Sequence, residues 1–338
     1  MPYYPVIKLS QRQIEYVNKF NNNPKIKFEK ISCLNCSSAN QKILFTNDRF
    51  GLNQKTVLCK KCGLMFLNPR MTQNSADFFY KSDLYRNMYN NDDLGKINSE
   101  AWEGFEKNPK ILLAGGLAYF DIINSLNLKY NSVCDIGAGH GFGLKLFQLA
   151  GKDVLGYEPS EYLCNFIKKK GMNVINGFID NVKGEYDLVL MIHVLEHLVN
   201  PIDVLKKLRK HIKKYLFIEV PGSINKLQSM HPAHMFHFSL NTLSHIVTKC
   251  GFKRIYIDYK WSHGRNIDNN DMVYALFEKT DKIETYQYNY AYEVKKYKRI
   301  YYKYCIKIFI KRVLRKILRK INPNLEKKIV NIIDLRGS

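Results

Sequence analysis

The chain has 338 residues and a formal net charge of +23, with 53 Lys and Arg against 30 Asp and Glu. This length accommodates one full α/β domain with smaller additions. No apolar run follows a basic cluster at the start and no stretch of about 18 apolar residues occurs, so neither a secretory signal nor a membrane span is expected. The charge favours an acidic partner: nucleic acid, nucleotide or anionic membrane.

The sequence divides into five regions, of which the first three precede the α/β pattern. Residues 1–30 are polar and rich in asparagine, and we expect a short helix or arm there. Residues 31–70 form a compact module around two cysteine pairs. Residues 71–129 are predicted to be a mainly helical linker, because aromatic side chains occur there without strand alternation.

The cysteine pairs give the spacing C-x2-C-x22-C-x2-C, from Cys33 and Cys36 to Cys59 and Cys62. Each C-x-x-C turn brings two thiolates to one metal, and two such turns complete a tetrahedral Zn2+ site. Four protein ligands leave no position open for water, so we expect a structural zinc ion. The spacing also fits metal binding in a reducing cytoplasm better than a disulfide framework, and a free or regulatory dithiol is the alternative.

Residues 130–280 switch to short apolar strands separated by helices, which is typical of a parallel sheet. Strands are expected at 132–136, 153–157, 172–176, 186–192, 214–220, 252–258 and 272–279, and helices near 141–150, 160–170, 201–212 and 239–250. A hairpin-like loop joins the last two strands. The predicted fold is therefore α/β, a Rossmann-like, mostly parallel sheet of seven strands with helices on both faces and the final strand inserted antiparallel.

The segment 133–143, VCDIGAGHGFG, predicts a buried strand, a glycine turn and a helix start. Gly137, Gly139 and Gly141 let the backbone turn sharply and let a cofactor lie against bare main chain. Glu158 ends the next predicted strand, where a Rossmann-type fold places a carboxylate that accepts hydrogen bonds from ribose hydroxyls. The segment therefore predicts an adenosine-cofactor site, against the alternative of a glycine turn without a ligand.

Two features distinguish between adenosine cofactors. An NAD site requires G-x-G-x-x-G, but Phe142 occupies the position of the third glycine. Asp135 precedes the turn, where a carboxylate repels a pyrophosphate and suits a sulfonium and an ammonium group. This D-x-G-x-G-x-G pattern with its distal acid resembles class I S-adenosylmethionine-dependent methyltransferases.

That resemblance implies S-adenosyl-L-methionine as the cofactor, with Asp135, the three glycines and Glu158 binding it. It also implies a residue after the third strand that faces the adenine amine. Asp180 is the expected residue, and Asn176 or Gly177 are the alternatives at this register.

The fourth strand runs into YDLVLMIHVLEHLVNP, residues 186–201, so His193, Glu196 and His197 fall at the mouth of the crevice. HVLEHL is similar to the motif that follows strand four in this methyltransferase group, in which the Glu-His pair lies beside the transferable methyl. The resemblance implies that His193 contacts the cofactor and that Glu196 and His197 are catalytic, with His197 as a candidate base because histidine titrates near neutrality. Alternatively, Glu196 and His197 cap or pack the following helix.

After the fifth strand comes HPAHMFHFSLNTL, residues 231–243, which resembles the acceptor-side lid of the same group. This implies that His234 and His237 contact the substrate. His231, His234 and His237 stand at three-residue steps, as metal ligands can. No carboxylate or cysteine supports them locally, and a metal-binding histidine normally needs an orienting partner, so we do not expect a metal there.

The run CKKCGLMFLNPRMTQNSADFFY, residues 59–80, is similar to methyltransferases with an N-terminal zinc-ribbon module, many of which act in surface-polysaccharide and sugar-nucleotide pathways. The resemblance covers most of residues 31–260 and implies methyl transfer to a nucleotide- or lipid-linked sugar, at O or C. An RNA methyltransferase is the first alternative, although the fourth strand lacks an N-P-P-Y type signature. A non-catalytic scaffold is the second, and the intact Asp135, glycines and Glu158 argue against it.

Residues 281–338 form a basic tail, in which 294–320 contains twelve Lys and Arg and no acidic residue. Residues 306–321 show helical periodicity, with an apolar stripe opposite a basic face. A packed helix, an interfacial helix on anionic lipid and a nucleic-acid arm are all compatible with this pattern. The membrane alternative agrees with the family, so we expect a cytoplasmic enzyme with peripheral contact at the inner membrane face through 294–321; nucleic acid is less favoured, and oligomeric state is open.

Overall fold

A computed structural model of the chain describes residues 9–89, 94–108, 118–222, 231–259 and 272–282, together with isolated positions between 291 and 313. The chain divides into two compact units, Met1–Tyr288 and Asn289–Ser338. In the second unit the described positions are all helical: Ala291, Val294, Lys295, Arg299, Tyr302, Ile306 and Val313. The rest of the predicted amphipathic helix at 306–321 lies outside the described residues.

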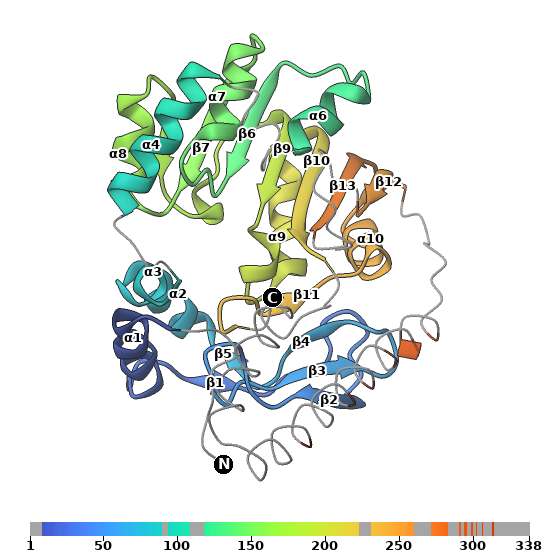
Figure 1. The fold of residues 1–338 in the computed structure, drawn as a ribbon. Helices are drawn as coiled ribbons and strands as arrows, with labels where there is room; N and C mark the ends of the chain where they lie inside the picture. The colour runs from blue at the N-terminus through green and yellow to red at the C-terminus, as the bar shows by residue number, and fades with distance from the viewer. Residues whose placement is uncertain are drawn as a thin grey trace. The chain divides into compact units, whose positions relative to one another are not determined.

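The first unit contains a seven-stranded sheet with the order β12-β13-β10-β9-β6-β7-β8 (Figure 1). The strands are β6 (Ser132–Ile136), β7 (Asp153–Glu158), β8 (Val174–Asn176), β9 (Tyr186–Ile192), β10 (Ile212–Pro221), β12 (Phe252–Asp258) and β13 (Met272–Lys279). β13 pairs antiparallel with both β10 and β12, whereas the pairs that β6, β7, β8, β9 and β10 form with one another are all parallel. The predicted fold, including the inserted antiparallel strand, is confirmed.

Helices alternate with these strands, and a polar side chain caps several of their first turns. They are α6 (Ala118–Ser125), α7 (Phe142–Leu149), α8 (Glu161–Lys169), α9 (Pro201–Leu208) and α10 (Leu240–Thr248). The hydroxyls of Ser160 and Ser239 accept hydrogen bonds from backbone N–H groups in α8 and α10, which satisfies donors that a helix start leaves free. α9 is shorter than predicted, because a 3-10 turn at Arg209–His211 follows it and β10 begins at the buried Ile212.

The N-terminal part combines small sheets with helices. α1 (Gln11–Asn21) is the short helix expected within residues 1–30, and β1 (Phe28–Glu29) pairs with β5 (Arg70–Met71). The other strands are β2 (Gln41–Phe45), β3 (Thr56–Cys59) and β4 (Met65–Leu67), and the helices that follow are α2 (Gln73–Lys81), α3 (Leu84–Tyr89) and α4 (Leu94–Lys107). None of the helices in the described part of the chain is long and apolar enough to cross a membrane.

A fourth strand completes the small sheet, and it comes from the other end of the unit. β11 (Phe236–His237) lies beyond β10 in the sequence and pairs antiparallel with β4, giving the order β11-β4-β3-β2 (Figure 1). The backbone N–H of Leu67 donates to Met235 O at 2.9 Å, and that of Met235 donates to Glu196 O at 2.9 Å. The cysteine module is thus hydrogen-bonded to the segment after β10, and this segment to the turn after β9.

Candidate functional site

The glycine turn after β6 adopts backbone conformations that side chains disfavour. Gly137, Gly139 and Gly141 have φ angles of +75°, +56° and +77°. A Cβ on Gly137 would lie 2.8 Å from Cγ2 of Val194, in the turn after β9. The N–H groups of Gly137 and Ala138 both donate to Tyr157 O, at 2.8 and 3.1 Å, so the turn is held against β7.

Glu158, at the end of β7, supports this turn directly. One carboxylate oxygen accepts from Gly139 N and the other from Ser160 N, both at 2.9 Å. Burial raises the pKa of Glu158, and the two backbone N–H groups oppose that rise. The structure therefore brings Glu158 to the glycine turn, while its contact with a ribose stays a prediction.

Asp135 lies in β6, just before the turn, and is buried. Its Oδ1 atom has no hydrogen-bond partner among the described residues. Burial, together with the negative charge of Glu158, raises its pKa to about 7. A buried acceptor without a donor is unfavourable, and a cationic ammonium group of a ligand would supply the donor. Asp135, the bare glycine turn and Glu158 therefore fit S-adenosylmethionine.

Phe142, where an NAD site has its third glycine, has a packing role. Its ring stacks on Trp102 of α4 with centroids 4.7 Å apart, and the Trp102 indole N–H donates to His140 O at 3.2 Å. Trp102 thus holds the carbonyl of a residue inside the glycine turn. The sequence indicated an aromatic helical segment here but no contact with the turn.

Comparison of the sequence with models of known protein families gives a match over the part of the chain that contains the glycine turn and its two carboxylates. Residues 107–257 match the family described as a methyltransferase domain. The chain carries an S-adenosylmethionine-dependent methyltransferase domain.

Individual relatives of the domain are distant. The chain is 30% identical over 128 residues to a tRNA U34 carboxymethyltransferase of Campylobacter fetus subsp. fetus, and the match spans 35% of this chain and 41% of that protein. A magnesium protoporphyrin IX methyltransferase structure from Synechocystis, with bound S-adenosylmethionine, covers 61% of this chain and 95% of its own at 16% identity and a TM-score of 0.40. A putative methyltransferase from Listeria monocytogenes covers 48% and 98%, at 15% identity and a TM-score of 0.41.

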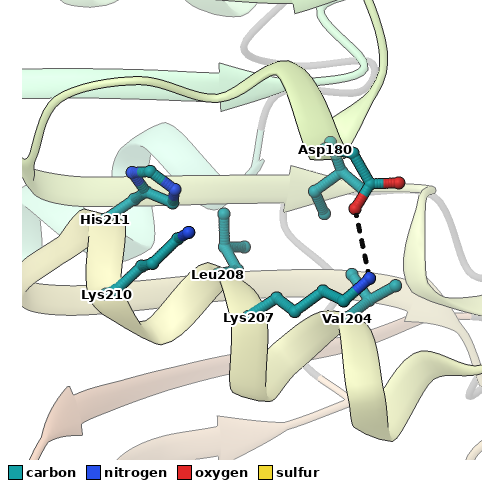
Figure 2. A pocket seen from close by; sticks show the side chains of 7 residues that line it. Asp180, Val204, Lys207, Leu208, Lys210 and His211 are labelled. Carbon is teal, nitrogen blue, oxygen red and sulfur yellow. Dashed lines mark hydrogen bonds and ion pairs between the residues drawn. The ribbon is translucent and has the colours of Figure 1, made fainter.

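Asp180, the residue expected at the adenine, lies in the turn Ile179–Asn181 after β8 and lines a pocket of about 260 Å³ beside α9. Figure 2 shows its carboxylate directed toward Lys207, with the two groups 3.5 Å apart. Its side chain is 72% exposed. The alternative residue Asn176 instead donates to Glu158 O and Pro159 O, at 3.2 and 3.1 Å, and so holds the chain after β7.

The turn after β9 brings one histidine between two buried carboxylates. His193 Nδ1 lies 3.3 Å from Glu196 Oε1, and its Nε2 lies 3.4 Å from Glu219 Oε1. Burial lowers the pKa of His193, but hydrogen bonds to these carboxylates outweigh it and raise the pKa to about 10. The residue also has a φ of +55°, a strained backbone of the kind that clusters at functional sites. Glu219, at the end of β10, was not predicted.

His197 is held in one orientation. Its Nδ1 lies 2.9 Å from Ala233 O and 2.9 Å from the Tyr80 hydroxyl, which itself donates to Ala233 O. Because a carbonyl only accepts, Nδ1 carries the proton and Nε2 keeps its lone pair. Burial lowers the pKa of His197, so the neutral ring predominates near pH 7.

The histidines after β10 lie against this group. The ring of His234 is centred 4.9 Å from that of His197 and 3.7 Å from that of His231. Tyr89 of α3 reaches His231 Nδ1 at 2.9 Å through its hydroxyl. His237, in β11, is only 1% exposed, and its ring centre lies 6.0 Å from that of His234.

Tyr80, Tyr85 and Tyr89 form an aromatic wall beside these histidines, with Tyr85 packed between the other two and 6.3 Å from the His197 ring. The sequence predicts only a helical linker with aromatic residues for this segment and indicates no role for these rings. Only the spacing of Tyr85 and Tyr89, four residues apart on one helix face, could have indicated a shared surface.

The four predicted metal-binding cysteines come together. Cys33 Sγ lies 3.4 Å from Cys62 Sγ, and Cys36 Sγ lies 3.5 Å from Cys59 Sγ, with all four sulfurs within 4.8 Å of one another. Sulfurs bound tetrahedrally to zinc lie about 3.8 Å apart. Both turns close with a backbone hydrogen bond, from Ser37 N to Cys33 O and from Gly63 N to Cys59 O, each at a residue with positive φ. This four-cysteine cluster is consistent with a zinc site.

Proposed function

We propose that the protein transfers a methyl group from S-adenosylmethionine to a hydroxyl or acidic carbon of a small acceptor, a sugar carried on a nucleotide or a lipid. The observation that carries the proposal is His197, a half-buried neutral imidazole whose Nε2 carries no proton. It lies in the turn after β9, whose Val194 packs against Gly137 of the cofactor turn. A base in this position is adjacent to where the methyl donor binds.

The proposed roles follow from the geometry of the chain's own residues. Asp135, Glu158 and the three glycines hold the cofactor, whose sulfonium supplies an electrophilic methyl group when bound. His193 and Asp180 are the further predicted cofactor contacts. His197 accepts the proton of the acceptor through Nε2, and Tyr80 and Ala233 O keep its ring oriented.

The sugar acceptor rests on two supports. The run 59–80 resembles zinc-ribbon methyltransferases of polysaccharide pathways. Tyr80, Tyr85 and Tyr89 give a wall of rings and hydroxyls, which suits a ligand with apolar faces and many hydroxyl groups. His234 and His237 are the predicted substrate contacts, and His234 is the nearer of the two to His197.

A second acceptor class is RNA. The relative from Campylobacter fetus is named for modification of tRNA, and the net charge of +23 suits a polyanion. Binding of tRNA that weakens steeply with salt, together with methyl incorporation into tRNA, would support RNA over a sugar.

The experiment is a methyl-transfer assay with radiolabelled S-adenosylmethionine on nucleotide sugars, lipid-linked sugars and tRNA. We expect label in a sugar fraction. His197→Asn keeps an N–H donor for Ala233 O and removes the Nε2 base, so kcat should fall about 100-fold or more while cofactor affinity is unchanged. If calorimetry detects no binding of S-adenosylmethionine, the methyltransferase proposal is wrong and the non-catalytic scaffold is the remaining hypothesis.

For the cysteine cluster we propose structural Zn2+. Metal analysis of the purified chain should find zinc bound, and Cys36→Ser should lose it. If the cysteines instead form a regulatory dithiol, metal analysis should find no zinc and the thiols should react readily with a thiol reagent.

For the tail we propose peripheral contact of residues 294–321 with an anionic membrane at its cytoplasmic face. The full chain should float with vesicles containing phosphatidylglycerol and not with phosphatidylcholine alone. A chain ending at residue 293 should lose this binding, and equal flotation of both chains would contradict the proposal.

A further inference from the structure

We propose that Glu196, His197 and His234 bind a divalent first-row transition-metal cation at the acceptor end of the site, separate from the cysteine cluster. The sequence argued against a metal at the histidines of 231–237, because no carboxylate lies near them along the chain. The fold supplies one. Glu196, from the turn after β9, offers an oxygen that lies with nitrogens of His197 and His234 in a group spanning at most 4.8 Å.

The distances are close to those of a coordinated ion. Ligands about 2.1 Å from one metal lie about 3.0 to 4.2 Å from each other. Glu196 Oε1 and His197 Nε2 are 3.8 Å apart. Movements of the His234 ring of less than about 1 Å would bring the third ligand into the same range.

The hydrogen bonds leave a position that a cation would fill. The proton of His197 is on Nδ1, donated to Ala233 O, so the Nε2 lone pair faces the Glu196 carboxylate with no proton between them. The Glu196 side chain is 1% exposed, and its Oε2 has no partner in the part of the chain that the structure describes. Glu196 Oε1 already has His193 Nδ1 as a partner, so the acceptors left without a donor among the described residues are Glu196 Oε2 and His197 Nε2, and a metal ion would satisfy both.

The arrangement also has the orienting contact that the sequence lacked. A metal-binding histidine usually donates its other ring N–H to a carbonyl or carboxylate, and His197 donates to Ala233 O. The segment that carries His234 is bound to the Glu196 backbone, since Met235 N donates to Glu196 O at 2.9 Å. The three ligands are therefore held by main-chain hydrogen bonds before any metal binds.

The local charge favours a cation. The carboxylates of Glu196 and Glu219 are both buried, and His193 lies between them as their shared ion-pair partner. Two histidines and a carboxylate suit Mn2+, Fe2+, Co2+ or Zn2+ better than a hard cation bound by oxygen alone.

Three protein ligands leave coordination positions open, unlike the closed set of four cysteines. An acceptor hydroxyl at such a position would be acidified by the metal and would release its proton to bulk water, because His197 Nε2 would then be a ligand and could not also accept that proton. This consequence rests on the proposed function, whereas metal binding itself does not.

The test uses the full chain, dialysed against EDTA and titrated with Mn2+ while free Mn2+ is followed by electron paramagnetic resonance. We expect one Mn2+ site per chain, with zinc still present at the cysteines in the same sample. Glu196→Gln and His234→Gln should each weaken Mn2+ binding at least about 10-fold. His211→Gln, which changes a histidine on the 3-10 turn after α9, is the matched control and should bind like the wild type.

Circular dichroism and thermal melting check the fold of each variant, and His234→Gln, at a less buried position than Glu196→Gln, keeps the test valid if the latter unfolds. Co2+ gives a second readout, because histidine and carboxylate ligands lack the intense charge-transfer bands of thiolates. Absence of Mn2+ and Co2+ binding outside the cysteine cluster, or wild-type affinity in both variants, would overturn the proposal. Absence of methyl transfer with Mn2+ bound would overturn the proposed function alone.

Discussion

Replacing Asp135 with asparagine should separate cofactor binding from stability. The wild-type carboxyl is buried and its pKa is raised to about 7 from 3.8, which corresponds to about 4 kcal/mol of unfavourable ionisation at pH 8. Because the folded-state pKa lies above that of the unfolded chain, the folded state holds the extra proton between about pH 4 and pH 7. The free protein should therefore lose stability as the pH rises through this window.

Asp135→Asn removes that ionisation cost. At pH 8 the variant should unfold with a free energy about 2 to 4 kcal/mol higher than the wild type, and near pH 4 the difference should vanish. Its affinity for S-adenosylmethionine should fall about 10- to 100-fold, since a charge-assisted hydrogen bond contributes about 1.5 to 3 kcal/mol.

Urea unfolding at both pH values and calorimetry with S-adenosylmethionine measure the two effects. The exposed Asp153→Asn, at the start of β7, is the control and should change neither. A variant that is destabilised equally at pH 4 and pH 8, or one that binds the cofactor like the wild type, would refute the reasoning.

Three further predictions concern the cofactor turn and the cysteine cluster. Gly137→Ala places a Cβ 2.8 Å from Val194 Cγ2 at a φ of +75°, so the midpoint of thermal unfolding should drop and calorimetry should detect no cofactor binding. Adding Val194→Ala to the same chain removes the clash but not the backbone strain, so it should recover only part of the lost midpoint temperature. Trp102→Phe keeps an aromatic ring but removes the donor to His140 O and part of a fully buried side chain, so the cofactor should bind several-fold more weakly and the melting temperature should also fall. Cys59→Ser should abolish zinc in metal analysis and lower the melting temperature, and an unchanged zinc content would contradict a four-cysteine site.

The elements of the large sheet could be predicted because their signals are local. The strands at 186–192, 252–258 and 272–279 have the predicted limits, since each is a short run rich in β-branched or aromatic residues and bounded by turn residues. The glycine turn was also readable, because positive φ angles select glycine at particular positions. The end of α9 was missed, because its periodicity continues while Ile212 already pairs in β10.

Contacts between segments that lie far apart in the chain could not be predicted from the sequence. Glu196 and His234 meet because the segment after β10 returns to the turn after β9, and no periodicity encodes that return. β11 has two residues and no alternation, so it becomes a strand only because β4 offers a free edge. Trp102 reaches the glycine turn from a helix in a region predicted only as a linker.

The pairing of β11 with β4 limits where the chain can be cut into fragments that fold independently. A fragment ending near residue 70 would contain all four cysteines, but its sheet would lack its outer strand. Met65, Phe66 and Leu67 are each at most 1% exposed, and the cut would uncover them on an open edge that templates aggregation. We therefore expect the cysteine module and the methyltransferase domain to unfold as one cooperative unit, so that removal of the proposed zinc ion makes the segment 231–239 accessible to protease together with residues 31–70.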